Sequence, residues 1–468
     1  MAFSGFLEDD EKINYILSTR SRLYPLEPRG LGSFMKEGLI SYITRLSEAH
    51  CIEVGTLVSY ECSLNFGVPR IYSYHSNKVM STFYKDATSI NGFGSISLEM
   101  EKAIKKLTLR SDIEEMNLNK WVFIPRNKSI VKRYKHWCSQ CYSEWKEAGV
   151  PIYDPLIWSI NLLKICPVHK TLLQTSCPKC FREIPIIHHR SMISHCIYCF
   201  NSLITNIENQ ATMSEEEQLF QEWLSESLGS MLVCEKEFVD TTSICNSLKM
   251  FREKYCENND RVFSRVLLIE NKRRQLNAYC RGAAAPHFNL LLWFCYILGV
   301  KLVDICTGGE FTQNGRDSND SLHDFKKYFM IENKWSKIDK VLVREKLQKY
   351  YTCYPPRSFK SISRELNVEE SYLRKSFPKE AKFLSTKFRK FREAQKIENL
   401  QMQKNLMEKV IDDFFRENNA VPSKSMLKRL MGSSHVTFKR ELMDYYREKI
   451  KEYNVITHEY FGVIGPFG

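Results

Sequence analysis

Four closely spaced pairs of cysteine and histidine residues in the middle of the chain constrain its fold more than any other feature. Two residues separate the members of each pair, which makes a tight turn that directs both side chains at one ion. The pairs are Cys138 and Cys141, Cys166 and His169, Cys177 and Cys180, and Cys196 and Cys199. In chain order they predict two Zn²⁺ ions, one held by three thiolates and an imidazole and one by four thiolates. An interleaved pairing of the same eight residues stays open.

The protein fills all four positions of each predicted site, which is typical of a structural site, since a catalytic zinc keeps one position for water. Four pairs in succession argue against chance spacings or redox dithiols. Nearby histidines are expected beside the ligands or at the surface, because the ligand count is already complete; they are His136, His188, His189 and His195. The other nine of the 16 cysteines are scattered among apolar neighbours and predict reduced, buried thiols.

Positive charge is concentrated toward the C-terminal end. The formal net charge is +13, and residues 321–450 contain 30 Lys and Arg against 17 Asp and Glu. This surplus predicts a surface for a polyanion, although a solvated helical face would give the same count. No apolar stretch approaches the ~20 residues of a membrane span, and the acidic first residues lack the apolar segment of a secretory signal. We therefore expect a cytoplasmic protein without a membrane partner.

A helix-turn-helix pattern lies in the basic segment. Prolines flank residues 358–377, apolar Ile362 and Leu366 face Leu373 and Phe377, and Asn367 occupies the turn. The second helix of such a motif reads bases with its N-terminal residues, and cations on the following helix suit phosphates. The base-reading candidates are Ser371, Tyr372, Arg374 and Lys375, and the phosphate candidates are Lys382, Lys387, Arg389, Lys390 and Arg392.

A second pattern starts at Pro422 and turns at Gly432. Its base-reading candidates are His435, Thr437, Lys439 and Arg440. A long helix over residues 393–418 would space the two units along one duplex. A weaker third pattern, over residues 281–305, has a nearly all-apolar middle segment that predicts a buried helix more than a base reader. A plain three-helix core is the alternative for any one such pattern.

The chain resembles the TniQ/TnsD family of transposon target selectors. The order that carries the resemblance around the metal pairs is Trp137 before Cys138, then Trp158, the Cys166-Pro-x-His169 pair with Leu172, and the Cys177-Pro-x-Cys180 pair. Near the N-terminus, Glu37, Ser41, Arg45 and Leu46 stand where that family begins a helix. The length is similar to that of the long, TnsD-like members, which carry an added DNA-binding half.

This resemblance implies a bacterial, nucleoid-associated protein that binds a chromosomal attachment site in double-stranded DNA. It would recruit the transposon's AAA+ ATPase regulator, and transposase subunits are further possible partners. We expect Tyr42, Arg45 and Glu48 to face that partner, while Leu39, Ile43 and Leu46 are buried. Alternatives are an adaptor that bridges an RNA-guided CRISPR effector complex to transposition, a zinc-dependent nuclease or the transposase itself, and a plain transcription regulator. Phosphate-binding loops and nucleophile motifs are absent from the sequence, so we expect no enzyme activity.

The patterns together predict a mainly α, multidomain chain with small zinc-ribbon or knuckle elements and tandem C-terminal helix-turn-helix units. The expected divisions are a helical TniQ-like domain over residues 1–135, a double zinc unit over 136–205, a helical linker domain over 206–320, and the basic DNA-binding region over 321–468. Trp158, Leu162 and Leu163 give an apolar stripe that is expected to pack against the zinc unit.

Overall fold

The computed structural model describes residues 20–66, 87–122, 130–205, 213–267, 273–284, 286–308, 340–366, 368–431 and 440–461. Helices dominate these residues, and isolated β-bridges take the place of extended strands within them. The chain divides into two compact units, Met1–Glu332 and Asn333–Gly468. The predicted mainly α, multidomain architecture is confirmed, whereas the four-domain division remains a prediction. No described helix is both long enough and apolar enough to span a bilayer.

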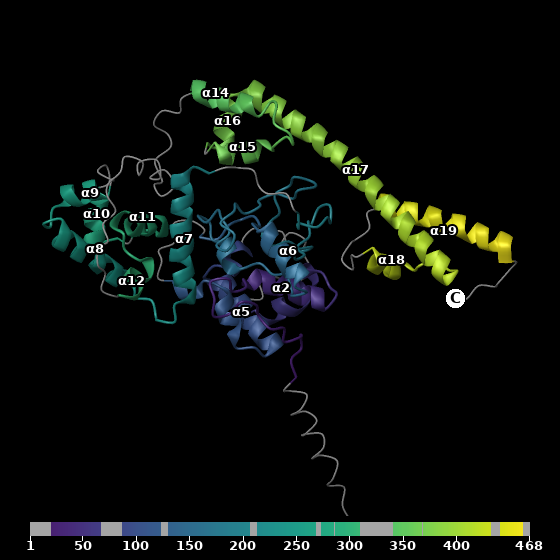
Figure 1. Cartoon of the computed structure of the whole chain (residues 1–468), viewed down its shortest axis with the longest axis horizontal. Coiled ribbons are helices and arrows are strands. Elements are labelled where there is room, and N and C mark those ends of the chain that lie inside the picture. The colour runs from purple at the N-terminus through teal and green to yellow at the C-terminus, as the bar shows by residue number, and fades with distance from the viewer. Residues whose placement is uncertain are drawn as a thin grey trace, which may run out of the picture. The chain divides into compact units, whose positions relative to one another are not determined.

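The N-terminal part of the first unit packs around α2 (Leu39–Ala49) and α5 (Ser95–Thr108) (Figure 1). Apolar residues of α2 recur at helical spacing and are fully buried, including Leu39, Ile43 and Leu46. The shorter segments here are α3 (Val54–Thr56), the π-helical turn η1 (Leu57–Cys62), and the 3-10 turns η2 (Ser63–Asn65), η3 (Ala87–Ile90), η4 (Asp112–Met116) and η5 (Asn119–Trp121).

The start of α2 is fixed by a contact across the chain. The Asn91 side chain accepts a hydrogen bond from Ile40 N at 2.8 Å, which satisfies one of the free amides of the first helical turn. A Cβ atom at Gly38, the residue before the helix, would lie 2.8 Å from the amide nitrogen of Asn91. A side chain at this position would therefore push the Asn91 amide away from the start of α2.

A buried ion pair joins α2 to the segment just before it, at residues that were singled out in the sequence. The Arg45 guanidinium lies 2.5 Å from Glu37, and Ser41 donates a 2.7 Å hydrogen bond to the same carboxylate. The Ser41 hydroxyl in turn accepts from Asp154 N at 2.9 Å, which ties α2 to the segment beside the metal-binding residues. A paired, hydrogen-bonded arrangement is what makes burial of two charges tolerable.

The expectation that Tyr42 and Arg45 face a partner is corrected by this packing. Tyr42 is fully buried and donates a hydrogen bond to Leu26 O, and Arg45 is only 9% exposed. Glu48 is half-buried and accepts a hydrogen bond from Ile193 N at 2.8 Å. These three polar side chains were expected at the surface, but each has a hydrogen-bond or ion-pair partner inside the protein.

The rest of the first unit combines a region of short elements with a helical bundle. Residues 130–205 contain α6 (Ser139–Glu147) and the 3-10 turn η6 (Leu156–Ser159). The bundle contains α7 (Glu215–Val233), α8 (Thr241–Tyr255), α9 (Asp260–Val266), α10 (Arg273–Cys280), α11 (Phe288–Leu298) and α12 (Leu302–Thr307). Nearly all of α11 is buried, as its apolar sequence predicts.

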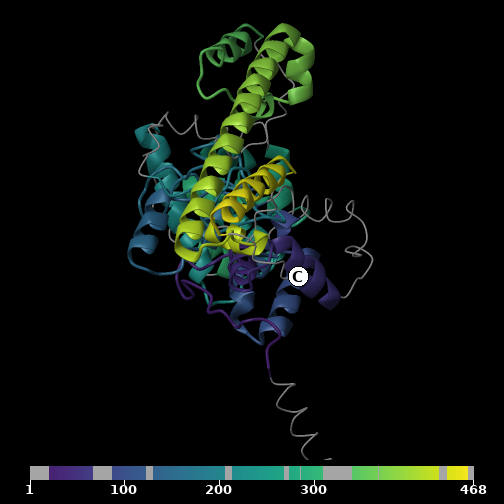
Figure 2. The same cartoon turned by 90° about the vertical axis from the view of Figure 1, so that its right-hand side faces the viewer.

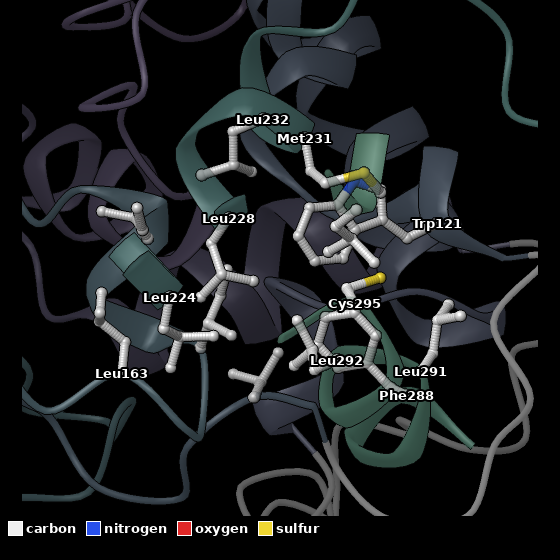
Figure 3. Packing of buried hydrophobic residues seen from close by; sticks show 14 of the residues in the cluster. Trp121, Leu163, Leu224, Leu228, Met231, Leu232, Phe288, Leu291, Leu292 and Cys295 are labelled. Atoms are coloured by element: carbon white, nitrogen blue, oxygen red, sulfur yellow. The ribbon is translucent and has the colours of Figure 1, made fainter. Parts of the chain in front are cut away.

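Helix α7 joins the bundle to the region of short elements in one hydrophobic core. Figure 3 shows Leu224 and Leu228 of α7 between Leu163 and the α11 residues Leu292 and Cys295. The Gln221 side chain adds two hydrogen bonds, accepting from Lys164 N and donating to Leu162 O. The metal-binding region and the bundle therefore share a core rather than being joined only by the chain.

The second unit is built on one long helix, α17 (Pro378–Asn418) (Figures 1 and 2). Helices α14 (Lys340–Lys349), α15 (Phe359–Glu365) and α16 (Glu370–Ser376) pack on its first turns around Ile362, Leu373 and Phe377. Helices α18 (Lys424–Leu430) and α19 (Arg440–Phe461) pack near its other end. Helices α15 and α16 contact one another, in the arrangement of the first predicted helix-turn-helix.

Glu48 gives a pH-dependent prediction. Burial raises the pKa of its carboxyl to about 7, above the usual ~4.3 of an unfolded chain. The charged form is therefore disfavoured in the folded state, and its cost grows as the pH rises from the unfolded pKa through 7. We expect Glu48→Gln, which keeps the hydrogen-bond acceptor, to raise the free energy of unfolding at pH 8 by on the order of 1–3 kcal/mol.

Denaturant unfolding at several pH values measures this difference, which should shrink toward pH 5.5. Glu147→Gln, on the exposed part of α6, is the control for loss of a charge alone. An equal gain at every pH would contradict the burial argument.

Candidate metal centre

The structure brings the eight predicted ligands together as two separate clusters. Cys138, Cys141, Cys166 and His169 form the first, and Cys177, Cys180, Cys196 and Cys199 form the second. Within each cluster the donor atoms all lie within 4.8 Å of one another. The grouping follows chain order, so the interleaved arrangement left open by the sequence is not the one that the structure adopts.

Distances within the clusters fit a tetrahedral metal ion. The Cys141 and Cys166 sulfurs are 3.6 Å apart, and His169 Nδ1 lies 3.3–3.7 Å from the three sulfurs. In the second cluster the Cys177–Cys199 and Cys180–Cys196 sulfur distances are both 3.6 Å. Zinc–sulfur bonds of about 2.3 Å would place the sulfurs of a tetrahedron ~3.8 Å apart, whereas a disulfide bond measures ~2.05 Å. The geometry matches shared coordination and excludes disulfides in these clusters.

Three of the four turns have the same backbone conformation. The residue after the second ligand has positive φ in each case: 57° at Lys170, 55° at Phe181 and 60° at Phe200. Its amide donates to the carbonyl of the first ligand, as Lys170 N does to Cys166 O at 2.9 Å. The first ligand's own amide then donates to a carbonyl five residues on, such as Thr171 O. This repeated turn explains why the two-residue spacing points both ligands to one side.

The fourth turn is the start of a helix. Cys138 is the residue before α6, in an extended conformation, and Cys141 lies in its first turn. The helix is anchored beside the ligands by Ser139, whose hydroxyl donates to Thr205 O at 2.6 Å, and by Trp137, whose ring N–H donates to Leu203 O at 3.1 Å. These bonds close the end of the metal-binding region onto its beginning.

Glu144 is a contributor that the sequence argument missed. His169 presents Nδ1 to the cysteines, and its Nε2 lies 2.8 Å from the Glu144 carboxylate. A carboxylate on the far nitrogen fixes the tautomer and orientation of a metal-binding histidine. The sequence spacing could have identified Glu144, because it follows Cys141 by one helical turn and therefore lies on the same face of the helix.

The thiols of each cluster compete for protons. A hydrogen bond from Cys141 is the main cause that lowers the pKa of Cys138, and the same contact raises the pKa of Cys141. Contact with Cys177 likewise lowers the pKa of Cys199, while it raises that of Cys196. Thiolates packed this closely repel one another, so all can ionise together only around a cation. The donor set therefore suits a divalent metal.

Trp158 and four histidines were also singled out in the sequence near the clusters. Trp158 is buried in the shared core, and the Lys132 ammonium donates to its carbonyl oxygen at 2.8 Å. His136 and His195 each contact a backbone carbonyl, and the rings of His188 and His189 lie 3.9 Å apart outside both clusters. Trp158 thus packs in the core, and none of the four histidines joins a described cluster.

The first set of base-reading candidates lies on α16 and is mostly exposed. Ser371 donates to Glu369, and Arg374 is 2.7 Å from Glu370 and lies over the Phe359 ring. Lys375 is exposed and Tyr372 is half-buried. These candidates therefore lie on one short helix, beside Glu369 and Glu370, which the sequence analysis did not consider.

The phosphate candidates on α17 differ in their surroundings. Arg389 and Lys390 are exposed, but the Lys387 ammonium donates to Tyr351 O at 2.5 Å and to Cys353 O at 3.3 Å. Lys387 therefore holds the loop before α15. In the second pattern, Arg440 begins α19 with its side chain 95% exposed, while His435, Thr437 and Lys439 lie outside the described residues.

Removal of one ligand tests the second cluster. We expect Cys177→Ser to lower the metal content from two ions per chain to one and to reduce the melting temperature, because a structural metal contributes directly to folding free energy. Elemental analysis and thermal unfolding measure the two effects. Cys51→Ser, at an exposed cysteine outside both clusters, should leave both unchanged. An unaltered metal content and melting curve in Cys177→Ser would refute the structural role.

Loss of the carboxylate behind His169 tests the first cluster. We expect Glu144→Ala to weaken metal binding there by ~10–100-fold, because the imidazole loses the partner that orients it. Competition against a chelator measures the change, with Glu147→Ala on the same helix as the matched control. Equal affinities in the two variants would show that Glu144 does not support the site.

The comparison with protein families agrees with this geometry. Residues 28–173 match the model of the TniQ family. The matched region contains α2 with its buried ion pair and the whole first cluster, and it ends before the second cluster. No curated protein sequence gives a significant match to the chain. TniQ is a domain of transposition-related, DNA-binding proteins, and the predicted resemblance is confirmed for residues 28–173, which form a TniQ domain.

Proposed function

We propose that the chain selects the DNA target of a transposon and leaves catalysis to other proteins. The observation that carries this proposal is the presence, in a chain with a TniQ domain, of a separate basic unit with an exposed helix-turn-helix. Cations outnumber acids by 13 in residues 321–450, which favours binding to a phosphate backbone. This combination fits the long, TnsD-like members of the family.

In this proposal the two clusters each hold one structural Zn²⁺. Three thiolates with an imidazole, or four thiolates, form a tetrahedral set that suits zinc. All donors come from the chain, so the ions would stabilise the fold and would not activate water. The metal sites would hold residues 130–205 as a scaffold beside α2.

The DNA-reading role falls to α16, with Ser371, Tyr372, Arg374 and Lys375 toward the major groove. Its N-terminal end carries Glu369 and Glu370, which disfavour phosphate contact at that point. An acidic side chain can instead accept a hydrogen bond from a cytosine amino group. The second unit would contribute Arg440 at the start of α19, which is exposed.

Recruitment of the AAA+ regulator is assigned to the TniQ domain as a whole. The resemblance supports this role, but the burial of Tyr42 and Arg45 removes them as contact residues. Co-purification of the ATPase with the full chain on target DNA measures the interaction. A variant of the TniQ domain that still binds target DNA but no longer retains the ATPase would be defective in recruitment alone.

Selection from a random duplex library, with RNA absent, tests target selection. Enrichment of one sequence, followed by binding of that duplex in gel shifts, is the expected result. Enrichment of nothing, with binding only through an RNA-guided effector complex, would favour the adaptor alternative. Nicking of the duplex in Mg²⁺ would contradict the non-catalytic assignment.

Arg374 gives a test at one side chain. Its exposed ion pair with Glu370 is worth at most about 1 kcal/mol, so a guanine edge can displace it. We expect Arg374→Ala to weaken binding to the selected duplex by about 1–3 kcal/mol and to change random DNA less. Gel shifts on both duplexes make the comparison, with Arg416→Ala at the distant end of α17 as control. Equal losses on the two duplexes would reassign Arg374 to phosphate contact.

A further inference from the structure

Helix α17 carries one small bundle near each end. Its 41 residues correspond to ~60 Å at the usual rise per residue. Ala381 and Leu384 are buried against α15 and α16, and Met407 and Ile411 are buried where α18 and α19 pack. None of the described residues between Leu384 and Met407 is buried. Figures 1 and 2 show a single uninterrupted helix over this stretch.

The buried positions that face the two bundles are separated by the length of one turn of DNA. About 23 residues separate Leu384 from Met407, which corresponds to ~35 Å along the helix axis. One turn of B-form DNA is ~34–36 Å long, and paired helix-turn-helix units bind segments that far apart. The helix therefore spaces two small bundles by the repeat of the major groove.

Unpaired cations follow one side of α17, beginning just before Leu384. Lys382, Arg389 and Lys396 are spaced by seven residues, which places them on one face, and Lys390 extends that face. All four are exposed, and we call them the basic stripe. In the described part of the chain none of the four makes an ion pair.

Some cations elsewhere in the unit have carboxylate partners. Arg344 lies 2.9 Å from Glu380, and Lys449 lies 2.7 Å from Glu408. The four cations of the basic stripe, by contrast, are left without a carboxylate partner among the described residues. DNA carries one phosphate charge per ~1.7 Å of axis, so a duplex alongside offers more than enough partners.

We propose that α17 acts as a ruler on one duplex. The basic stripe lies along the phosphate backbone, and it holds the two end bundles on segments about one helical turn apart. This inference rests on the proposed function, since it assumes that the unit binds duplex DNA. It adds to that function that the target duplex has two bound segments, and it gives the distance between them.

Footprinting of the full chain on the selected duplex gives the first test. Two protected patches with centres ~10–12 bp apart are expected. A single patch, or patches at another spacing, would overturn the ruler while target selection stands. Failure to enrich any sequence would instead contradict the proposed function.

A compensating insertion gives the sharper test. Duplication of residues 385–406 lengthens α17 by ~33 Å, about six helical turns, so the second bundle keeps nearly the same face. We expect this variant to lose at least tenfold in affinity for the original duplex and to recover on a duplex with 10 bp added between the patches. An insertion of 5 bp should help neither protein. A variant that binds all three duplexes alike would refute a rigid ruler.

The basic stripe is tested by salt dependence. Replacing Lys382, Arg389, Lys390 and Lys396 by Gln should reduce the slope of log affinity against log salt by ~3–4, on both selected and random duplexes. The matched control replaces four other exposed cations of the unit, Lys346, Lys349, Lys409 and Arg416. Equal reductions in the two variants would show a general effect of charge and would contradict the placement of the basic stripe along the phosphate backbone.

Discussion

Mutual repulsion of closely packed thiolates is the constraint on which the middle of this protein depends. Sulfur atoms 3.6 Å apart in a buried cluster cannot all carry charge unless a cation lies among them. Residues 130–205 have one helix of two turns or more and no described strand, so regular backbone hydrogen bonding does little to hold them. A metal ion in each cluster would supply the missing cross-links, and the shared core with α7 attaches this region to the helical bundle.

Ligand identity was predictable because the chemistry is local. Each turn of two intervening residues is determined by neighbouring positions, and the repeated positive φ at Lys170, Phe181 and Phe200 is a consequence of that turn. The helical content was equally accessible, since apolar spacing in α2 and the all-apolar sequence of α11 reflect the burial that each helix has. Such patterns report on one element at a time.

What the sequence could not provide were contacts between distant residues. Arg45 was expected at the surface because Leu39, Ile43 and Leu46 take the buried positions of the helix, yet it is buried with Glu37, eight residues earlier. Lys387 was counted as a phosphate contact, although the carbonyls that it binds lie about 35 residues earlier. Glu144 was overlooked because its partner, His169, is on another turn. In each case the side chain's role is decided by a residue that periodicity cannot locate.

The buried pair on α2 also bears on how genetic data for this domain should be interpreted. Glu37, Ser41 and Arg45 join one hydrogen-bonded network inside the protein, so the residues that carry the family resemblance here maintain its interior. A screen for lost transposition would recover substitutions at these positions for want of correctly folded protein. Genuine docking mutants would have to be sought among residues that the fold leaves at the surface, where a change abolishes partnership without lowering the yield of intact protein.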